Sequence, residues 1–137
     1  VIQAARTVYN DYDQYHSSLD NKDFMDIKSV KDSVQKIYFF LRAFEINRSS
    51  LLPKVSGGEP FLGKRGLKPT INSSQTRSMS SDDDDDSRNK LNLMLNIISL
   101  VDGKHRLQEI VEFLHTTYEK AVPTIEELIE KGVIKNV

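Results

Sequence analysis

Apolar residues recur at helical spacing in three successive segments between Lys90 and Val137, and a short apolar run closes the chain. Gly103 follows the first segment and Gly132 follows the third, and glycine suits the left-handed position at which helices end. The first segment has two apolar stripes, so we expect that helix to be buried on two sides. The stripe positions are Leu91, Met94, Leu95, Ile98 and Val101 with Leu93, Ile97 and Leu100, then Leu107, Ile110, Val111 and Leu114, then Ala121, Val122, Ile125, Leu128 and Ile129.

The order helix, helix, short turn, helix, strand is that of a winged helix-turn-helix, with "VIKNV" as the strand. This fold alone does not determine what the domain binds. The third helix carries more carboxylates than lysines, and Pro123 lies near its start. Because DNA affinity comes largely from phosphate neutralisation, the charge pattern favours packing or partner docking and argues against nucleic acid. The charged residues are Glu119, Glu126, Glu127 and Glu130 against Lys120 and Lys131.

Two histidines, His105 and His115, lie at the edges of the second of these helices. Lone histidines of this kind are more often surface or capping residues than metal ligands. We therefore interpret both as surface or capping residues.

A longer amphipathic helix is predicted near the other end of the chain. Its apolar stripe has helical spacing, and Tyr38 and Phe40 widen it. Ser29 and Asp32 have the spacing of a capping box at its start. We expect a core helix that packs against something sizeable. The stripe is Val30, Val34, Ile37, Leu41 and Phe44.

Three zones follow from composition: 1–52, a connector over 53–89, and the winged helix over 90–137. Glycine and proline punctuate the connector, which we predict to be ordered around Phe61 to Leu67 and mobile from Ser73 to Ser87. Five adjacent aspartates, Asp82 to Asp86, repel one another and favour a solvated loop. They lack the glycine turn and the spaced ligands of a calcium loop.

The bulk composition excludes some classes of protein. The chain has 137 residues and a net charge of −1, so no global field recruits nucleic acid or anionic lipid. It has no cysteine, which excludes disulfides and thiolate metal sites. No apolar run approaches the ~20 residues of a membrane span, and we expect a cytoplasmic protein without membrane contact. The opening "VIQAARTVYN" indicates that the beginning of a longer protein is missing.

The stretch "YHSSLDNKDFMD", Tyr15 to Asp26, resembles the "YHTSxDN" segment of bacterial aminopeptidase-like proteins with two zinc ions. These proteins belong to the group of dizinc exopeptidases that includes leucine aminopeptidases and glutamate carboxypeptidase-like enzymes. "GGEPFLGKRGL", Gly57 to Leu67, resembles an element that follows the catalytic region in that subgroup. "ISLVDGKHRLQEIVEFL" resembles the opening of its C-terminal winged helix.

The resemblance implies that the intact protein has an α/β fold, a zinc exopeptidase domain with a mostly parallel sheet. This chain is expected to be mostly α-helical and to end in a small winged helix-turn-helix. His16 matches the last zinc ligand of the family, and a neutral imidazole suits zinc. Asp20, Tyr15 and Arg6 are expected in supporting or substrate-positioning roles, Arg6 by holding a carboxylate of substrate or protein.

The other ligands and the catalytic base of the family have no counterpart in this chain, which is therefore expected to be inactive alone. Ser17, Leu19 and Gln14 also depart from the family pattern. Without the resemblance, a histidine satisfied by backbone hydrogen bonds in a tight loop would be the simpler interpretation of His16.

Three functional hypotheses remain open. The first is a C-terminal fragment of a zinc-dependent hydrolase, whose partners would be a peptide or amide substrate and the rest of the catalytic domain. The second is a non-enzymatic winged helix that docks to protein or DNA. The third is a regulatory subunit that completes a site in another chain. The sequence leaves open whether the chain forms a homo-oligomer.

Overall fold

The structure is a computed structural model that describes residues 3–8, 10–55, 58, 60–67 and 81–137. It divides into two compact units, Val1–Arg42 and Ala43–Val137. The elements in chain order are α1 (Ile27–Arg48), β1 (Leu51–Pro53), the 3-10 helix η1 (Leu62–Arg65), α2 (Ser81–Leu100), α3 (Leu107–Phe113), α4 (Tyr118–Glu130) and β2 (Ile134–Asn136).

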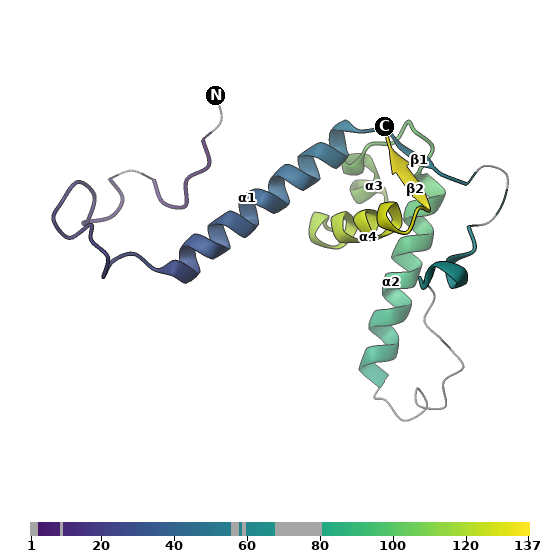
Figure 1. Ribbon diagram of the computed structural model, residues 1–137, viewed down its shortest axis with the longest axis horizontal. Coiled ribbons are helices and arrows are strands. Elements are labelled where there is room, and N and C mark those ends of the chain that lie inside the picture. Colours follow the sequence, from purple (N-terminus) through teal and green to yellow (C-terminus); the bar gives the residue numbers. More distant parts are fainter. Residues whose placement is uncertain (1–2, 9, 56–57, 59, 68–80) are drawn as a thin grey trace. The chain divides into compact units, whose positions relative to one another are not determined.

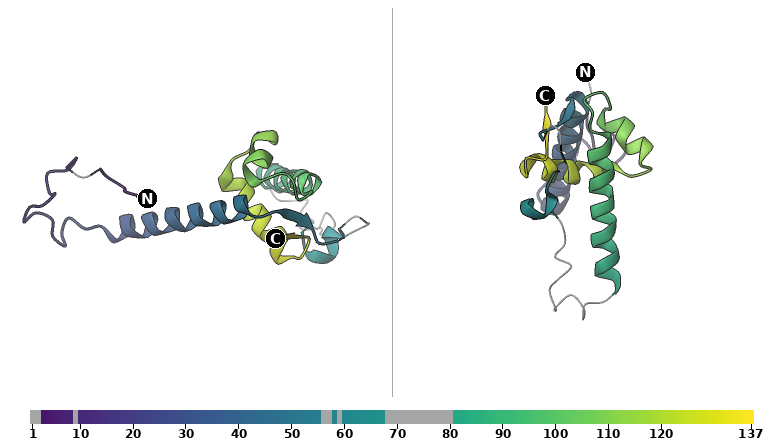
Figure 2. Two further views of the ribbon diagram at one scale, coloured as in Figure 1. Left: turned by 90° about the horizontal axis from the view of Figure 1, so that it is seen from above. Right: turned by 90° about the vertical axis from the view of Figure 1, so that its right-hand side faces the viewer.

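The second unit contains the hydrophobic core. In both figures α3 and α4 gather against the C-terminal half of α2 (Figures 1 and 2). The apolar stripes predicted for α3 and α4 supply seven of the sixteen buried apolar residues in the described part of the chain, since these helices bury one face each. The fully buried side chains of the three helices and the strand after them are Met94, Ile97, Leu107, Ile110, Val122, Ile125, Leu128, Val133 and Ile134.

The two strands form an antiparallel pair whose members come from the two ends of this unit. Leu51 pairs with Asn136, and Pro53 pairs with Ile134. Backbone hydrogen bonds extend the pair on both sides, from Ser50 to Val137 and from Lys54 to Val133. The strand predicted from "VIKNV" is confirmed, but its partner β1 was not predicted.

Helix α2 is longer and less buried than the sequence predicts. It begins at Ser81, so residues 81–89 are helical instead of part of an irregular connector. Leu95 is exposed, and the buried residues of α2 are Met94 from the first predicted stripe and Ile97 from the second. The remaining stripe residues of α2 are half-buried: Leu91, Leu93, Ile98 and Leu100. The part of the predicted mobile segment at 73–80 lies outside the described residues.

Helix α1 begins two residues before the predicted cap. The carboxylate of Asp26 accepts hydrogen bonds from the backbone N–H groups of Lys28 and Ser29, at 3.1 Å each. Asp26 is therefore the N-cap, and the Ser29 capping box is wrong, because Ser29 already lies inside the first turn. The predicted core stripe is also wrong for this chain: all five of its residues are exposed, and the buried residue of α1 is Ile46.

The described chain is mostly helical with a two-stranded sheet, as the sequence predicted. The order α2, α3, α4, β2 reproduces the predicted helix, helix, turn, helix, strand. No helix in the described part of the chain combines the length and the apolar character needed to cross a membrane.

Candidate functional site

The helix-turn-helix consists of α3, a four-residue connection and α4. At the start of α3, the backbone N–H of Arg106 donates to the side chain of Glu109 at 2.7 Å. At the end of α3, His115 adopts a left-handed conformation with φ 48°. The backbone N–H of Thr116 donates to the carbonyl of Val111 at 3.1 Å. These contacts set the direction in which α4 leaves the turn.

Helix α4 presents a row of carboxylates to solvent on the side opposite the core. Residues 119, 123, 126 and 130 follow one another at intervals of four, three and four, which places them on one face of a helix. Three of these positions are glutamates: Glu119 and Glu130 are exposed, and Glu126 is half-buried. We call Glu119, Glu126 and Glu130 the acidic row. The opposite face carries Ala121, Val122, Ile125 and Leu128, all buried.

Nearby basic groups are engaged within the domain. The ammonium of Lys90 on α2 lies 2.8 Å from the carboxylate of Glu127 on α4. Nη1 of Arg65 in η1 donates to the carbonyl of Lys131, just after α4, at 2.6 Å. These contacts join α2 and η1 to α4.

A wing in the usual sense is a β-hairpin whose loop can reach a groove of DNA. In the described part of the second unit, the sheet consists of β1 and β2. In the sequence, η1, α2, α3 and α4 lie between these two strands. The pair therefore closes the domain by joining its two ends, and β1 and β2 are not connected by a hairpin loop.

The segment around His16 is a succession of tight turns in the first unit. Backbone hydrogen bonds run from Ser17 to Gln14 and from Asp20 to Ser17, at 3.1 Å each. His16 has a left-handed φ of 55°, and its exposed ring lies edge-on to Tyr15 with 4.2 Å between the ring centroids. The turns hold the imidazole at the surface of the loop, where solvent reaches it.

The three supporting residues predicted around His16 do not all lie at its ring: Arg6 and Asp20 line a cleft whose lining does not include His16. Tyr15 contacts the histidine ring. The carboxylate of Asp20 has no hydrogen bond to His16 among the hydrogen bonds of the described residues, and Asp20 is exposed. Arg6 lies instead at the first turns of α1.

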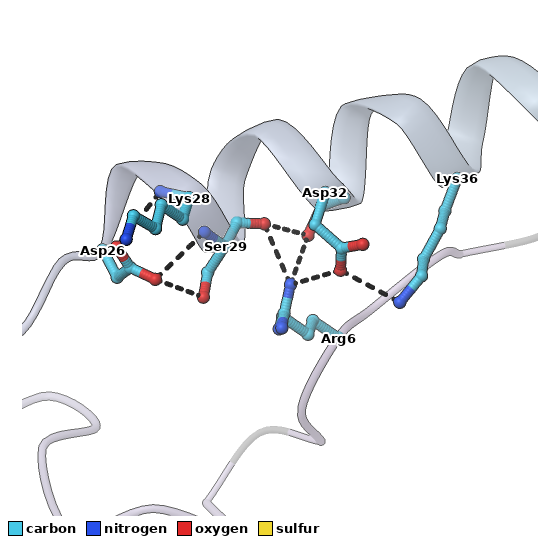
Figure 3. Close-up of polar contacts among 7 residues, drawn as sticks. Arg6, Asp26, Lys28, Ser29, Asp32 and Lys36 are labelled. Atoms are coloured by element: carbon cyan, nitrogen blue, oxygen red, sulfur yellow. Dashed lines mark hydrogen bonds and ion pairs between the residues drawn. The ribbon is translucent and has the colours of Figure 1, made fainter.

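Arg6 holds the start of α1 together (Figure 3). Its Nη1 donates to the carbonyl of Ser29 at 2.9 Å, to Asp32 at 3.0 Å and to the hydroxyl of Ser33 at 3.3 Å. Lys36 and Arg6 both contact Asp32, and the Lys36 hydrogen bond is the main cause that lowers the pKa of that carboxyl. The carboxylate that Arg6 binds in this structure thus belongs to the protein.

A cleft of about 840 Å³ opens between the loop and the first turns of α1. Arg6, Asp20 and Phe24 are among its lining residues. Its wall includes Asp26, whose pKa is lowered chiefly by the hydroxyl of Ser29 and then by the backbone N–H of Lys28. The sequence contained the signal for this cap, an aspartate directly before the first residue of the helix, which the capping-box pattern two residues later obscured.

The described residues do not form a complete metal site. No group of three or more histidine, aspartate or glutamate side chains in the described part of the chain could hold a metal ion. His16 offers one imidazole to a metal such as zinc, and one ligand does not fill the tetrahedral set that zinc prefers.

The comparisons with known proteins agree with the architecture of the second unit. A family model described as a winged helix-turn-helix matches residues 51–136, which include β1, η1, the three helices and β2. No curated protein and no solved structure matches the chain. The matched residues make up more than half of the 137-residue sequence. The chain therefore belongs to this winged helix-turn-helix family.

Proposed function

We propose that the winged helix of this chain is a protein-docking domain that uses the acidic row of α4 to bind a basic protein surface. The observation that carries the proposal is the charge of the helix-turn-helix. Residues 107–130 hold six glutamates and one lysine, and the acidic row lies on the face of α4 turned away from the core.

This charge opposes the phosphates of a duplex. A DNA-binding helix-turn-helix domain inserts the exposed face of its recognition helix into the major groove, between two phosphate backbones. Here that face would bring Glu119, Glu126 and Glu130 towards anions. Each such pair is repulsive and leaves a phosphate without a cation, whereas affinity for DNA rises with the number of phosphates neutralised.

A basic protein partner would present cations instead of phosphates to these carboxylates, so each of these contacts would be attractive. Lysine and arginine side chains facing the acidic row gain charge-assisted hydrogen bonds with carboxylates. Because Glu119 and Glu130 are exposed, each contact is worth little alone and is screened by salt, so the row acts mainly through steering and specificity.

The test uses the 137-residue chain and two fluorescent probes, a synthetic lysine-rich peptide and a random-sequence DNA duplex. Anisotropy titrations at low salt are expected to show binding of the peptide that weakens as salt is added. The triple variant Glu119→Gln, Glu126→Gln, Glu130→Gln is expected to lose that binding, since it removes the charge of the row and keeps the size of its side chains.

The matched control is Asp11→Asn, Asp13→Asn, Asp23→Asn, which removes the same number of charges from the first unit. The control is expected to bind the peptide as the unmodified chain does. Equal loss of binding in both variants would show that only net charge matters and would refute docking by the acidic row.

A second function, a zinc-dependent hydrolase, is favoured by one observation, the exposed imidazole of His16 in a left-handed loop. Strained backbone of this kind clusters at functional sites. In this proposal a longer protein that contains the chain supplies the remaining ligands and hydrolyses peptides or related amides. His16 would hold the metal, and Tyr15 would fix the orientation of its ring.

The test compares His16→Ala with His115→Ala in such a longer protein, because both histidines are exposed and both have a left-handed φ. Hydrolysis of N-terminal residues is expected to vanish in the first variant and on chelation, and to persist in the second. Full activity of the His16→Ala protein would exclude the ligand role.

A further inference from the structure

The apolar stripe of α1 follows a heptad spacing. Six of its apolar residues are separated by three and four positions in alternation over about two and a half heptads, and the spacing ends at Arg48. Apolar residues that recur in this way line one seam of a helix and are typical of helices that pack against another helix. The stripe is Ile27, Val30, Val34, Ile37, Leu41 and Phe44, with Tyr38 and Phe40 on its two edges.

The stripe is too large to be an ordinary exposed surface. Its eight side chains, the two edge residues included, are 46–70% exposed. If each exposes about 90 Å² of apolar surface, roughly half of what such side chains can bury, the patch is on the order of 700 Å². The largest apolar patch on a typical monomer is about 300–600 Å². A stable interface covers about 800 Å² on each partner, so the patch is of the size that a stable dimer needs.

The part of the stripe that lies in the first unit, Ile27 to Leu41, is not buried by the described residues of that unit. None of the described residues in the range 3–42 is buried, whereas the second unit has a closed core. The 22 residues of α1 include β-branched and aromatic side chains, which are modest helix formers. Packing of an apolar face normally supplies most of the stability of such a helix.

We propose that a second copy of this chain covers the stripe, with the two α1 helices packed antiparallel about a two-fold axis. In this arrangement Ile27 faces Phe44 of the other copy, Val30 faces Leu41, and Val34 faces Ile37. Every stripe residue then meets another stripe residue, so the stripe is complementary to itself, as a two-fold interface requires.

The antiparallel direction follows from the residues at the ends and edges of the stripe. A parallel pair in the same register would place Arg48 against Arg48 of the second copy, and the antiparallel pair leaves Arg48 beyond the last layer. The edges also fit by size. Phe40 lies near Ser33 of the other helix, and the ring of Tyr38 lies near the aliphatic stem of Lys31.

The inference is independent of the acidic row, and its test is the oligomeric state of the 137-residue chain. Sedimentation equilibrium over a concentration series is expected to show a reversible dimer of twice 15.7 kDa. The variant Val34→Asp, Ile37→Asp is expected to weaken association by at least about 100-fold, because it buries unpaired carboxylates in the central layer. The matched control, Gln35→Asp, adds a carboxylate to the same turn outside the stripe and is expected to dimerise normally.

A second variant, Val34→Ala, Ile37→Ala, keeps a high helix propensity, so loss of its dimer cannot be attributed to loss of the helix. It is expected to dimerise more weakly than the unmodified chain. A chain that stays monomeric throughout the series would overturn the proposal and leave the stripe to a different partner. Dimers that persist in both double variants would overturn it as well.

The chain has no cysteine, so engineered cysteines report the helix direction without background. Ile27→Cys chains mixed with Phe44→Cys chains are expected to form a disulfide between the two variants under mild oxidation. Ile27→Cys chains alone are expected to form none, since the antiparallel pair holds their helix starts roughly 25 Å apart. Efficient cross-linking of Ile27→Cys to itself would contradict the antiparallel arrangement.

Discussion

Gly103 shows how a single residue constrains the winged helix. It lies between α2 and α3 with φ 80°, and its backbone N–H donates to the carbonyl of Leu51 in β1 at 2.8 Å. A Cβ atom at this position would lie 2.6 Å from Cδ2 of Leu52. The glycine therefore permits both the left-handed turn and the close approach of β1.

We expect Gly103→Ala to lower the free energy of unfolding by about 1–3 kcal/mol, because it combines an unfavourable φ with a side-chain clash. Urea unfolding followed by circular dichroism measures the change. Gly63→Ala is the control, since a Cβ atom there meets nothing within 4 Å. Equal destabilisation by the two substitutions would contradict this account of the turn.

The same turn contains a carboxylate that makes folding depend on pH. Oδ1 of Asp102 accepts hydrogen bonds from the backbone N–H groups of His105 at 3.0 Å and Lys104 at 2.8 Å. These bonds, the one from His105 first, lower the pKa of Asp102 from 3.8 to about 2. Because the folded protein holds the charged form, this stability is present above the unfolded pKa of 3.8 and is lost as the pH falls towards 2.

We therefore expect Asp102→Asn to be less stable than the unmodified chain at pH 6 and to approach it in stability near pH 2. Urea midpoints of both proteins measured between these pH values provide the comparison. A difference in stability that does not change with pH would show that the charge of Asp102 has no part in the turn.

Several single-residue roles could be predicted from the sequence because they depend on local chemistry. Gly103 and Gly132 both have positive φ, as expected for glycines that follow helices, and His105 and His115 are both exposed. His16 could be recognised only by resemblance, because one histidine in a polar loop carries no pattern of its own. Its role as a ligand stays a prediction.

At the scale of elements, α1 depends on its cap and on Arg6. Asp26 binds two backbone N–H groups and the hydroxyl of Ser29, the last at 2.8 Å. Arg6 adds contacts to the next turn (Figure 3). The first turn of α1 is thus fixed by side chains that lie before the helix in the sequence.

We expect Asp26→Ala to increase amide hydrogen exchange in the first turn of α1, since it leaves the N–H groups of Lys28 and Ser29 without their acceptor. Asp26→Asn is expected to retain most of the protection, because an amide oxygen still accepts. Ser29→Ala serves as the comparison and is expected to have a smaller effect than Asp26→Ala. A larger increase in hydrogen exchange for Ser29→Ala than for Asp26→Ala would instead support the cap predicted at Ser29.

Helix interiors could be predicted from periodicity, but the starts of α1 and α2 could not. The stripes of α3 and α4 are largely buried as expected, with only Leu114 and Ile129 half-buried, since each helix packs within its own domain. The start of α2 was missed because a run of five like charges is more often found in a solvated loop than in a helix. The α1 stripe was expected in a core, and periodicity cannot tell whether the covering surface belongs to the same chain.

For the whole molecule, the winged helix-turn-helix followed from the order of its helices, but its sheet did not. β1 and β2 lie more than 80 positions apart in the sequence, and β1 is only three residues long. Such a pairing depends on where the folded helices bring the two ends of the domain, which local patterns do not encode. The family match thus begins at β1, before the predicted connector.

The central claim, that the winged helix docks to a basic protein surface and does not read DNA, is tested most directly by titrating the chain with a DNA duplex. Fluorescence anisotropy at low and at moderate salt measures both affinity and its salt dependence. We predict no binding at micromolar concentrations at either salt, because the acidic row repels phosphates. Micromolar binding that weakens steeply with added salt would contradict the claim and identify the domain as a nucleic-acid binder.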